Sequence, residues 1–152
     1  MAITAELHIY GNMLKKAFAK EIDWENDDIK CMLLDSNYVP NVDTDIYLND
    51  VIANEITGTG YTAGGQTLTN CTLTYDSANN KVIIDSDNPI WENSTITARY
   101  AVIYNNTPAT DSEKALICYF EFINDGTPVD VSSNSAIFEI VINANGIMDF
   151  DI

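Results

Sequence analysis

Apolar residues recur at every second position along several segments of the second half of the chain, and this period limits the fold more than any other feature. It is found in residues 96–104, 115–123 and 136–143. Successive side chains of a β-strand point to opposite faces, so a period of two is typical of a strand that packs one face on a core. One face of the first segment carries Ile96, Ala98, Tyr100, Val102 and Tyr104. Its other face carries Ala101 and Ile103, which favours a central place in a sheet.

Further strand-like runs cover residues 29–34 and recur from about residue 66 onward, separated by polar turns. A hairpin is expected around a turn at 76–80. Because no helical crossover separates the later runs, neighbouring strands are expected to pair antiparallel. With about six to eight strands, the sequence predicts a mainly β protein, an antiparallel β-sandwich or jelly-roll-like domain that spans residues 1–152 as one unit.

The N-terminal third is expected to contain one or two short helices. Residues 13–21 place Leu14, Ala17 and Phe18 at the spacing of one helix face, with lysines on the other sides. Two interpretations of this apolar face stay open: it covers one side of the sheet, or it docks on another subunit through Leu14 and Phe18. A second short helix is expected at 47–56.

The charge balance argues against two classes of partner. The chain has 23 Asp plus Glu against seven Lys plus Arg, a formal net charge of −16. Such a chain repels the phosphates of nucleic acids and of anionic membrane surfaces, so we expect neither partner. No apolar stretch reaches the ~20 residues of a membrane-spanning helix, and the first residues lack the pattern of a secretory signal. Synthesis in the cytoplasm is therefore expected.

The nucleophilic and basic side chains form no recognisable catalytic motif. His8, the single histidine, lies near the N-terminus with no nucleophile motif around it, and is expected to be a partly exposed strand residue. Three cysteines lie in separate apolar runs, which favours buried thiols over a disulfide framework: Cys31, Cys71 and Cys118. We therefore expect no enzymatic activity and no cofactor.

Two pairs of alternating acids offer a metal-binding alternative. Asp43 with Asp45, and Asp85 with Asp87, place carboxylates on loops where they would suit a hard cation such as calcium. Neither pair has the glycine and the distant glutamate of an EF-hand loop. Solvated turn acids without a metal are the favoured interpretation.

A glycine-rich run and a single arginine are the remaining candidates for contacts with a partner. The run at 58–65 contains Tyr61, Gly64 and Gly65, and it lacks the lysine of a phosphate-binding loop. It is interpreted either as a sharp bend that packs Tyr61 on the core or as a partner-binding loop. Arg99 is expected to pair with a carboxylate, either within the chain or across a subunit interface.

Three stretches carry a family resemblance: EIDW at 21–24, GTGYTAGG at 58–65 and TITARYAVIY at 95–104. Together they resemble small tailed-bacteriophage virion proteins that are encoded among head and tail genes. The likeness covers the chain from about Leu14 to Gly146, and it concerns the fold, because the family offers no catalytic residues to compare.

The resemblance implies a structural protein, and in the first place a capsid decoration or auxiliary head protein on the outer surface of the phage head. It also implies assembly in the host bacterial cytoplasm, residence in the virion and contacts with the major capsid protein or other virion proteins. A homo-oligomer is expected by the same analogy.

Two other functions stay open. A tail, fibre or receptor-binding module that recognises a host surface glycan would use the polar Asn- and Thr-rich loops. A metal-assisted hydrolase that depends on Asp85 is the more distant alternative.

Overall fold

Strands dominate the structure, as the alternation predicts. The computed structural model describes residues 3–152, with 42% strand and 8% helix. Its antiparallel sheets and one short helix near the N-terminus are consistent with a β-sandwich-like fold, so the predicted fold class is confirmed. No helix in residues 3–152 has the length and apolarity needed to cross a membrane.

The first layer is a six-stranded sheet built around the most apolar strands of the chain. Across the sheet its strands are β1 (Thr4–Ile9), β9 (Leu116–Asn124), β8 (Tyr100–Asn105), β2 (Ile29–Leu34) and β3 (Gln66–Thr67), and β10 (Thr127–Pro128) also pairs with β9. All six residues of β8 are buried. The predicted strand at 29–34 and the predicted central place of the segment after residue 99 are therefore confirmed.

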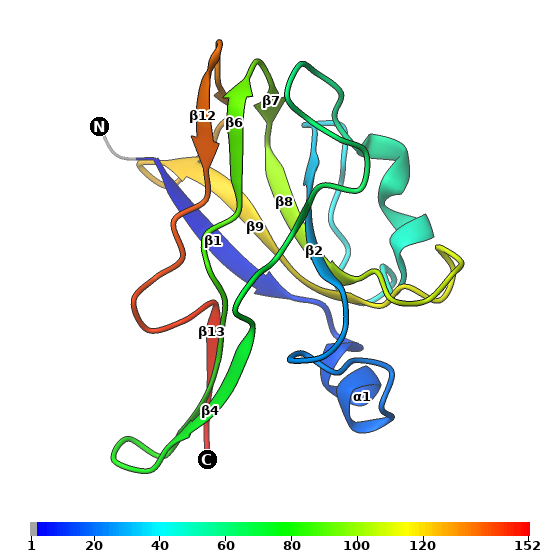
Figure 1. The fold of residues 1–152 in the computed structure, drawn as a ribbon, viewed down its shortest axis with the longest axis vertical. Coiled ribbons are helices and arrows are strands. Elements are labelled where there is room, and N and C mark those ends of the chain that lie inside the picture. The colour runs from blue at the N-terminus through cyan, green and yellow to red at the C-terminus, as the bar shows by residue number, and fades with distance from the viewer. Residues whose placement is uncertain (1–2) are drawn as a thin grey trace.

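The second layer is a long antiparallel ribbon. Its outgoing side is β5 (Lys81–Asp85), β6 (Ile90–Ser94) and β7 (Thr97–Ala98), and its returning side is β11 (Val131–Ser132), β12 (Ala136–Glu139) and β13 (Met148–Asp151). Next to β5, β4 (Thr72–Asp76) completes the predicted hairpin around the turn that follows it. Figure 1 shows the ribbon running along the length of the molecule, across the first sheet.

Apolar side chains pack on both faces of the first sheet. Between the layers, alternate residues of β2, β8 and β9 meet the ribbon in a cluster that contains Leu33, Ile103 and Trp91. On the other face the buried residues are tyrosine-rich and include Tyr10 and Tyr119. The segment that follows β2 closes this second cluster, which explains why both faces of the central strands are apolar.

The expected single strand over 96–104 is broken at Arg99. Ala98 belongs to β7 in the ribbon and packs in the core between the layers, whereas Tyr100 begins β8 in the first sheet and faces the tyrosine cluster. The chain changes layers at Arg99, so residues that a straight strand would place on one face lie in two cores. The predicted common face is therefore wrong.

The helix α1 (Met13–Phe18) is shorter than expected and does not cover the sheet. It buries Met13, while Leu14 is 46% and Phe18 is 87% exposed. The chain adopts a positive φ of 66° at Lys20, which ends the helix before it is long enough to lie along a sheet face. Figure 1 shows α1 beyond the end of the sheet. The interpretation that it covers one side of the sheet is wrong.

The second expected helix, over 47–56, is two short 3-10 helices, η1 (Leu48–Asp50) and η2 (Ile52–Asn54). Isolated β-bridges fix both ends of this segment, and they join Tyr47 to Ala115 and Glu55 to Leu34. With its ends held, the segment follows the surface of the tyrosine cluster and buries Leu48 and Val51 without forming an α-helix.

Candidate docking groove

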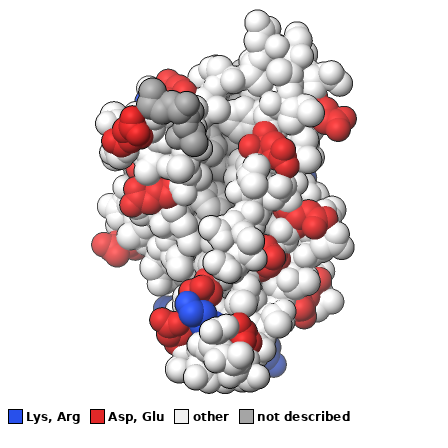
Figure 2. All heavy atoms as spheres, turned by 90° about the vertical axis from the view of Figure 1, so that its left-hand side faces the viewer, with Lys and Arg blue, Asp and Glu red and all other residues white. Residues whose placement is uncertain are grey.

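A groove of about 1030 Å³ opens between the edges of the two layers. One wall is β1 with the neighbouring β9, and the other is the returning side of the ribbon from β12 to the start of β13. Figure 2 looks at this side of the molecule and shows the hollow with acidic side chains around it. The groove lies where the sandwich is left open.

Apolar side chains form the floor and much of the rim of the groove. The floor is built by Leu7 and Ile9 from β1, Phe120 and Phe122 from β9, and Phe138 and Ile140 from the ribbon. On the rim, Ile3 is 48%, Ile137 is 64% and Val141 is 73% exposed. A contiguous exposed apolar surface is typical of a place where another molecule binds.

Both walls of the groove are strand edges. Within residues 3–152, β1 pairs with β9 alone and β12 with β6 alone, so one edge of each strand has no strand partner. Such an edge presents backbone N–H and C=O groups that can pair with an added strand. The charged residues that line the groove, in the described part of the chain, are Glu139 and Asp149, and both are acidic. The arrangement suits an extended, apolar segment that carries basic residues.

Three residues of the glycine-rich run are predicted contact residues: Tyr61, Gly64 and Gly65. They lie beside β2, on the side of the first sheet away from β1 and the groove. The Tyr61 hydroxyl accepts the Leu33 N–H at 3.1 Å and donates to Glu55 Oε1 at 2.8 Å. The same Glu55 oxygen accepts the Gly64 N–H at 2.6 Å, and burial raises the pKa of Tyr61. Tyr61 also stacks on Trp91, with ring centroids 6.1 Å apart. These contacts support the interpretation of the run as a sharp bend that packs Tyr61 on the core.

Replacing Tyr61 by phenylalanine is expected to lower the free energy of unfolding by about 2 kcal/mol, because it leaves the Leu33 N–H without a partner and removes one of the two hydrogen bonds that Glu55 Oε1 accepts. Tyr75→Phe is the matched control, since Tyr75 is 57% exposed and its hydroxyl bonds Asn80 at the surface. Urea denaturation measures both. An equal, small loss for the two variants would contradict a structural role for the Tyr61 hydroxyl.

Arg99, Leu14 and Phe18 lie outside the groove. The Nε–H of Arg99 donates to Asp130 Oδ1 at 2.9 Å, so the predicted pairing with a carboxylate is found within the chain. Leu14 and Phe18 lie one turn apart on α1 and are exposed. Their contact with another subunit stays a prediction.

The other candidate side chains have structural surroundings. Burial raises the pKa of the Cys31 thiol to about 12 and also raises the pKa of Cys118, which keeps both protonated. Cys71 is only half-buried, so the expectation that all three thiols are buried is wrong for Cys71. His8 is a partly exposed residue of β1, as predicted, and its ring stacks on Tyr119 with centroids 4.7 Å apart.

Three of the four acids in the two acid pairs accept hydrogen bonds through their carboxylates. Asp45 accepts the Tyr38 hydroxyl at 2.7 Å, and Asp87 accepts the Thr69 hydroxyl at 3.1 Å. Asp85 accepts the N–H of the next residue at 2.8 Å. These bonds support the interpretation of both pairs as turn acids.

Sequence reasoning missed the groove because it placed His8 on a strand without giving the bounds of that strand or its partner. The signal was present, since Glu6 and His8 alternate with Leu7 and Ile9, which is the period of a strand with one apolar face.

Comparison of the sequence with protein-family models and curated proteins, and of the fold with solved structures, found no match. The likeness to phage virion proteins therefore stays a prediction. The groove is the feature on which a functional hypothesis is best built.

Proposed function

We propose that this chain is a structural subunit of a tailed-phage virion that binds a neighbouring virion protein by taking up an extended segment of that partner. The observation that supports this most directly is the groove in which an edge of β1 and an edge of β12, neither with a strand partner in the described part of the chain, face one apolar floor. The resemblance supplies the setting, a decoration or auxiliary protein on the outer surface of the head.

Strand addition explains how such a groove binds. Backbone hydrogen bonds to β1 or β12 fix the direction and register of the added segment, and alternate side chains enter the groove. Each valine, leucine or isoleucine that leaves water contributes about 1.5 to 3 kcal/mol. Contacts of this kind exist only in the assembled particle, so they stabilise the particle by mass action.

The charge of the subunit favours the outer surface of the head and a basic partner segment. A net charge of −16 is repelled by packaged DNA. The same charge attracts a segment with lysine or arginine and speeds its encounter with the groove. The major capsid protein is the expected partner because it repeats over the whole shell.

Replacing Val141 by glutamate is expected to weaken binding to expanded phage heads that lack this subunit by about 100-fold. The change removes apolar area from the interface and would bury a charge. Val39→Glu is the matched control, because Val39 is 82% exposed and does not line the groove. Co-sedimentation with the heads measures the affinity and the stoichiometry.

Wild type and the Val39 variant should bind at the same fixed stoichiometry. Failure of the wild type to bind heads would count against the decoration role, and equal binding by the two glutamate variants would count against the groove.

A tail, fibre or receptor-binding module is the second candidate function. A hollow of about 580 Å³ beside the groove is lined by polar and acidic side chains such as Asp85, Asp87 and Asn88, which suit the hydroxyls of a glycan. Among the described lining residues none is aromatic, so the hollow offers no ring for a sugar to stack on. Binding on a glycan array, lost in Asp87→Asn, would favour this function over the first.

A further inference from the structure

Two glutamates face each other across the outermost strand pair of the first sheet. In the antiparallel register of β1 and β9, Glu6 lies directly opposite Glu121. Like charges in direct cross-strand positions destabilise a sheet. None of the ion pairs with Lys or Arg found in residues 3–152 includes either glutamate, so no lysine or arginine side chain of this part of the chain lies within ion-pair distance of them.

His8 completes a three-ligand cluster with the two glutamates. It lies two residues after Glu6, hence on the same face of β1, and its Nε2 is 3.9 Å from Glu6 Oε1. One ligand atom from each of Glu6, His8 and Glu121 lies within 4.8 Å of the other two. The His8 Nε2 is shielded from solvent and forms no hydrogen bond within the described residues, so a coordinating nitrogen is free beside two carboxylates.

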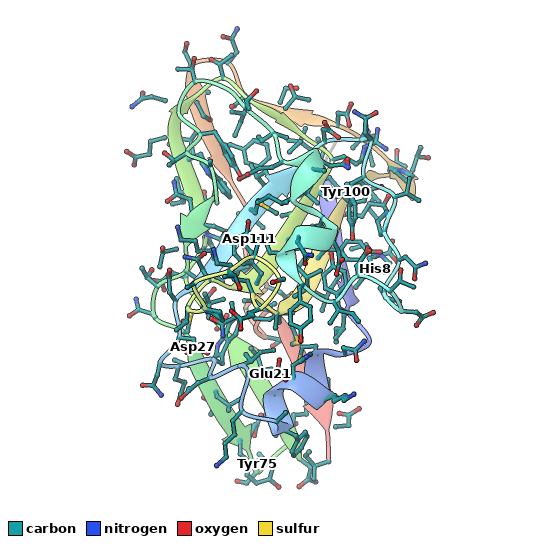
Figure 3. All side chains as sticks on the ribbon, turned by 90° about the vertical axis from the view of Figure 1, so that its right-hand side faces the viewer. His8, Glu21, Asp27, Tyr75, Tyr100 and Asp111 are labelled. Carbon is teal, nitrogen blue, oxygen red and sulfur yellow. The ribbon has the colours of Figure 1, made fainter. Side chains whose placement is uncertain are left out.

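The aromatic side chains around the cluster hold it in place. The His8 ring lies parallel to Tyr119 within 14°, and Tyr119 contacts Tyr100 with centroids 6.0 Å apart. Tyr100 is the register partner of Glu121 on the side away from β1. Burial, and then the charge of Glu121, raise the pKa of Tyr100. Figure 3 labels His8 and Tyr100 on the same side of the molecule. The imidazole is therefore oriented before any ion binds.

We propose that Glu6, His8 and Glu121 bind a divalent transition-metal ion of the Zn²⁺ class, which ties the edge strand β1 to β9. One imidazole and two carboxylates form a donor set that suits such ions, and a fourth position stays open to water. With metal–ligand bonds of about 2.1 Å, the ligand atoms of a tetrahedral site lie about 3.4 Å apart. Modest side-chain rotations would therefore bring the three ligand atoms to the distances that the ion requires. Glu6, whose side chain is 56% exposed, is free to make them. The proposal rests on the β1–β9 register and not on the proposed docking function.

Titration of metal-free protein with Zn²⁺ at about pH 7.5 tests the site. We expect a 1:1 complex by calorimetry and a rise in the melting temperature of about 5 °C at saturating ion. Ca²⁺ is expected to have no such effect, because it takes oxygen ligands. Each of His8→Gln, Glu6→Gln and Glu121→Gln should weaken Zn²⁺ binding by about 10-fold or more.

Glu92→Gln is the matched control, since Glu92 is an exposed acid on β6 outside the cluster. Without metal, Glu6→Gln should raise the melting temperature more than Glu92→Gln does, because it relieves the repulsion with Glu121. With Zn²⁺, Glu6→Gln should melt below the wild type. This reversal separates a metal ligand from a merely exposed glutamate. Absence of Zn²⁺ binding by the wild type, or undiminished binding by the His8 variant, would overturn the proposal.

Discussion

Replacing Gly65 by alanine is expected to lower the free energy of unfolding by about 4 kcal/mol, which is among the largest effects of a single methyl group. Gly65 has a φ of 82°, and a Cβ built there lies 1.9 Å from the carbonyl oxygen of Cys31 and 2.8 Å from the Cα of Met32. Both atoms belong to the backbone of β2, which is held between β8 and β3 and cannot move aside. The methyl group must therefore push β3 away from β2.

Gly126→Ala separates the backbone collision from the strain of a positive φ. Gly126 has a φ of 75°, and, apart from Gly126 and its two chain neighbours, no heavy atom of residues 3–152 lies within 4 Å of a Cβ built there. Its replacement should cost only the left-handed conformation of alanine, about 1 kcal/mol. Urea denaturation followed by circular dichroism measures both variants. Equal losses of unfolding free energy in the two variants would show that the close approach of Gly65 to β2 does not contribute to the cost of the Gly65 replacement.

The parts of the fold that could be predicted from the sequence are those in which neighbouring residues carry the signal. The strand at 29–34 was predicted with the bounds of β2, because six consecutive residues with apolar side chains on both faces fit a buried strand. The hairpin of β4 and β5 was predicted because polar turn formers separate two β-rich runs. Local patterns of this kind do not depend on the rest of the chain.

The corner at Arg99 could not be predicted, because the apolar period continues through it without a break. Ala98 and Tyr100 have the spacing of one strand face, yet each finds an apolar core, one between the layers and one outside them. The same alternation of apolar residues fits a straight strand that packs on one core and a chain that changes layers and packs on two. Only the pairing of β7 with β11, and of β8 with β2, tells the two apart.

The groove and the glutamate pair could not be predicted because they depend on the register between distant strands. The period of two shows that Glu6 and His8 share a face of β1, but it does not show that Glu121 lies opposite Glu6. In the same way, the period of two predicts that Phe138 and Ile140 share a buried face, but it does not show that Ile137, on the other face of β12, lies on the rim of an open groove. Non-local pairing decided both features.

The predicted contact residues show a related limit. Tyr61, Gly64 and Gly65 were singled out by an unusual composition, which marks a special backbone but not its purpose. Tyr61 and Gly64 form hydrogen bonds to Glu55, to β2 and to Tyr104 of β8, and Gly65 packs against β2, so the loop contacts its own sheet. A glycine-rich run that bends back on its own core has the same composition as one that faces a partner.

Replacing Trp91 by alanine is expected to lower the free energy of unfolding by about 4 kcal/mol. Trp91 is 1% exposed and lies between the ring of Tyr61 at 6.1 Å and the ring of Phe138 at 5.9 Å. The indole thus joins the glycine-rich loop on one side to the floor of the groove on the other. Its loss opens a cavity that Phe138 can enter, so the groove should lose its shape together with stability.

Trp91→Phe tests whether packing or the indole N–H carries this effect. The Nε1–H is buried, and no hydrogen-bond partner for it is found in residues 3–152. Phenylalanine keeps much of the ring contact and removes that donor, so the expected cost is about 1 kcal/mol. Urea denaturation of both variants, together with head binding by the phenylalanine variant, gives the comparison. If phenylalanine costs as much as alanine, the stability does not come from the ring contacts that phenylalanine keeps, but from what the indole alone supplies, its N–H or its second ring.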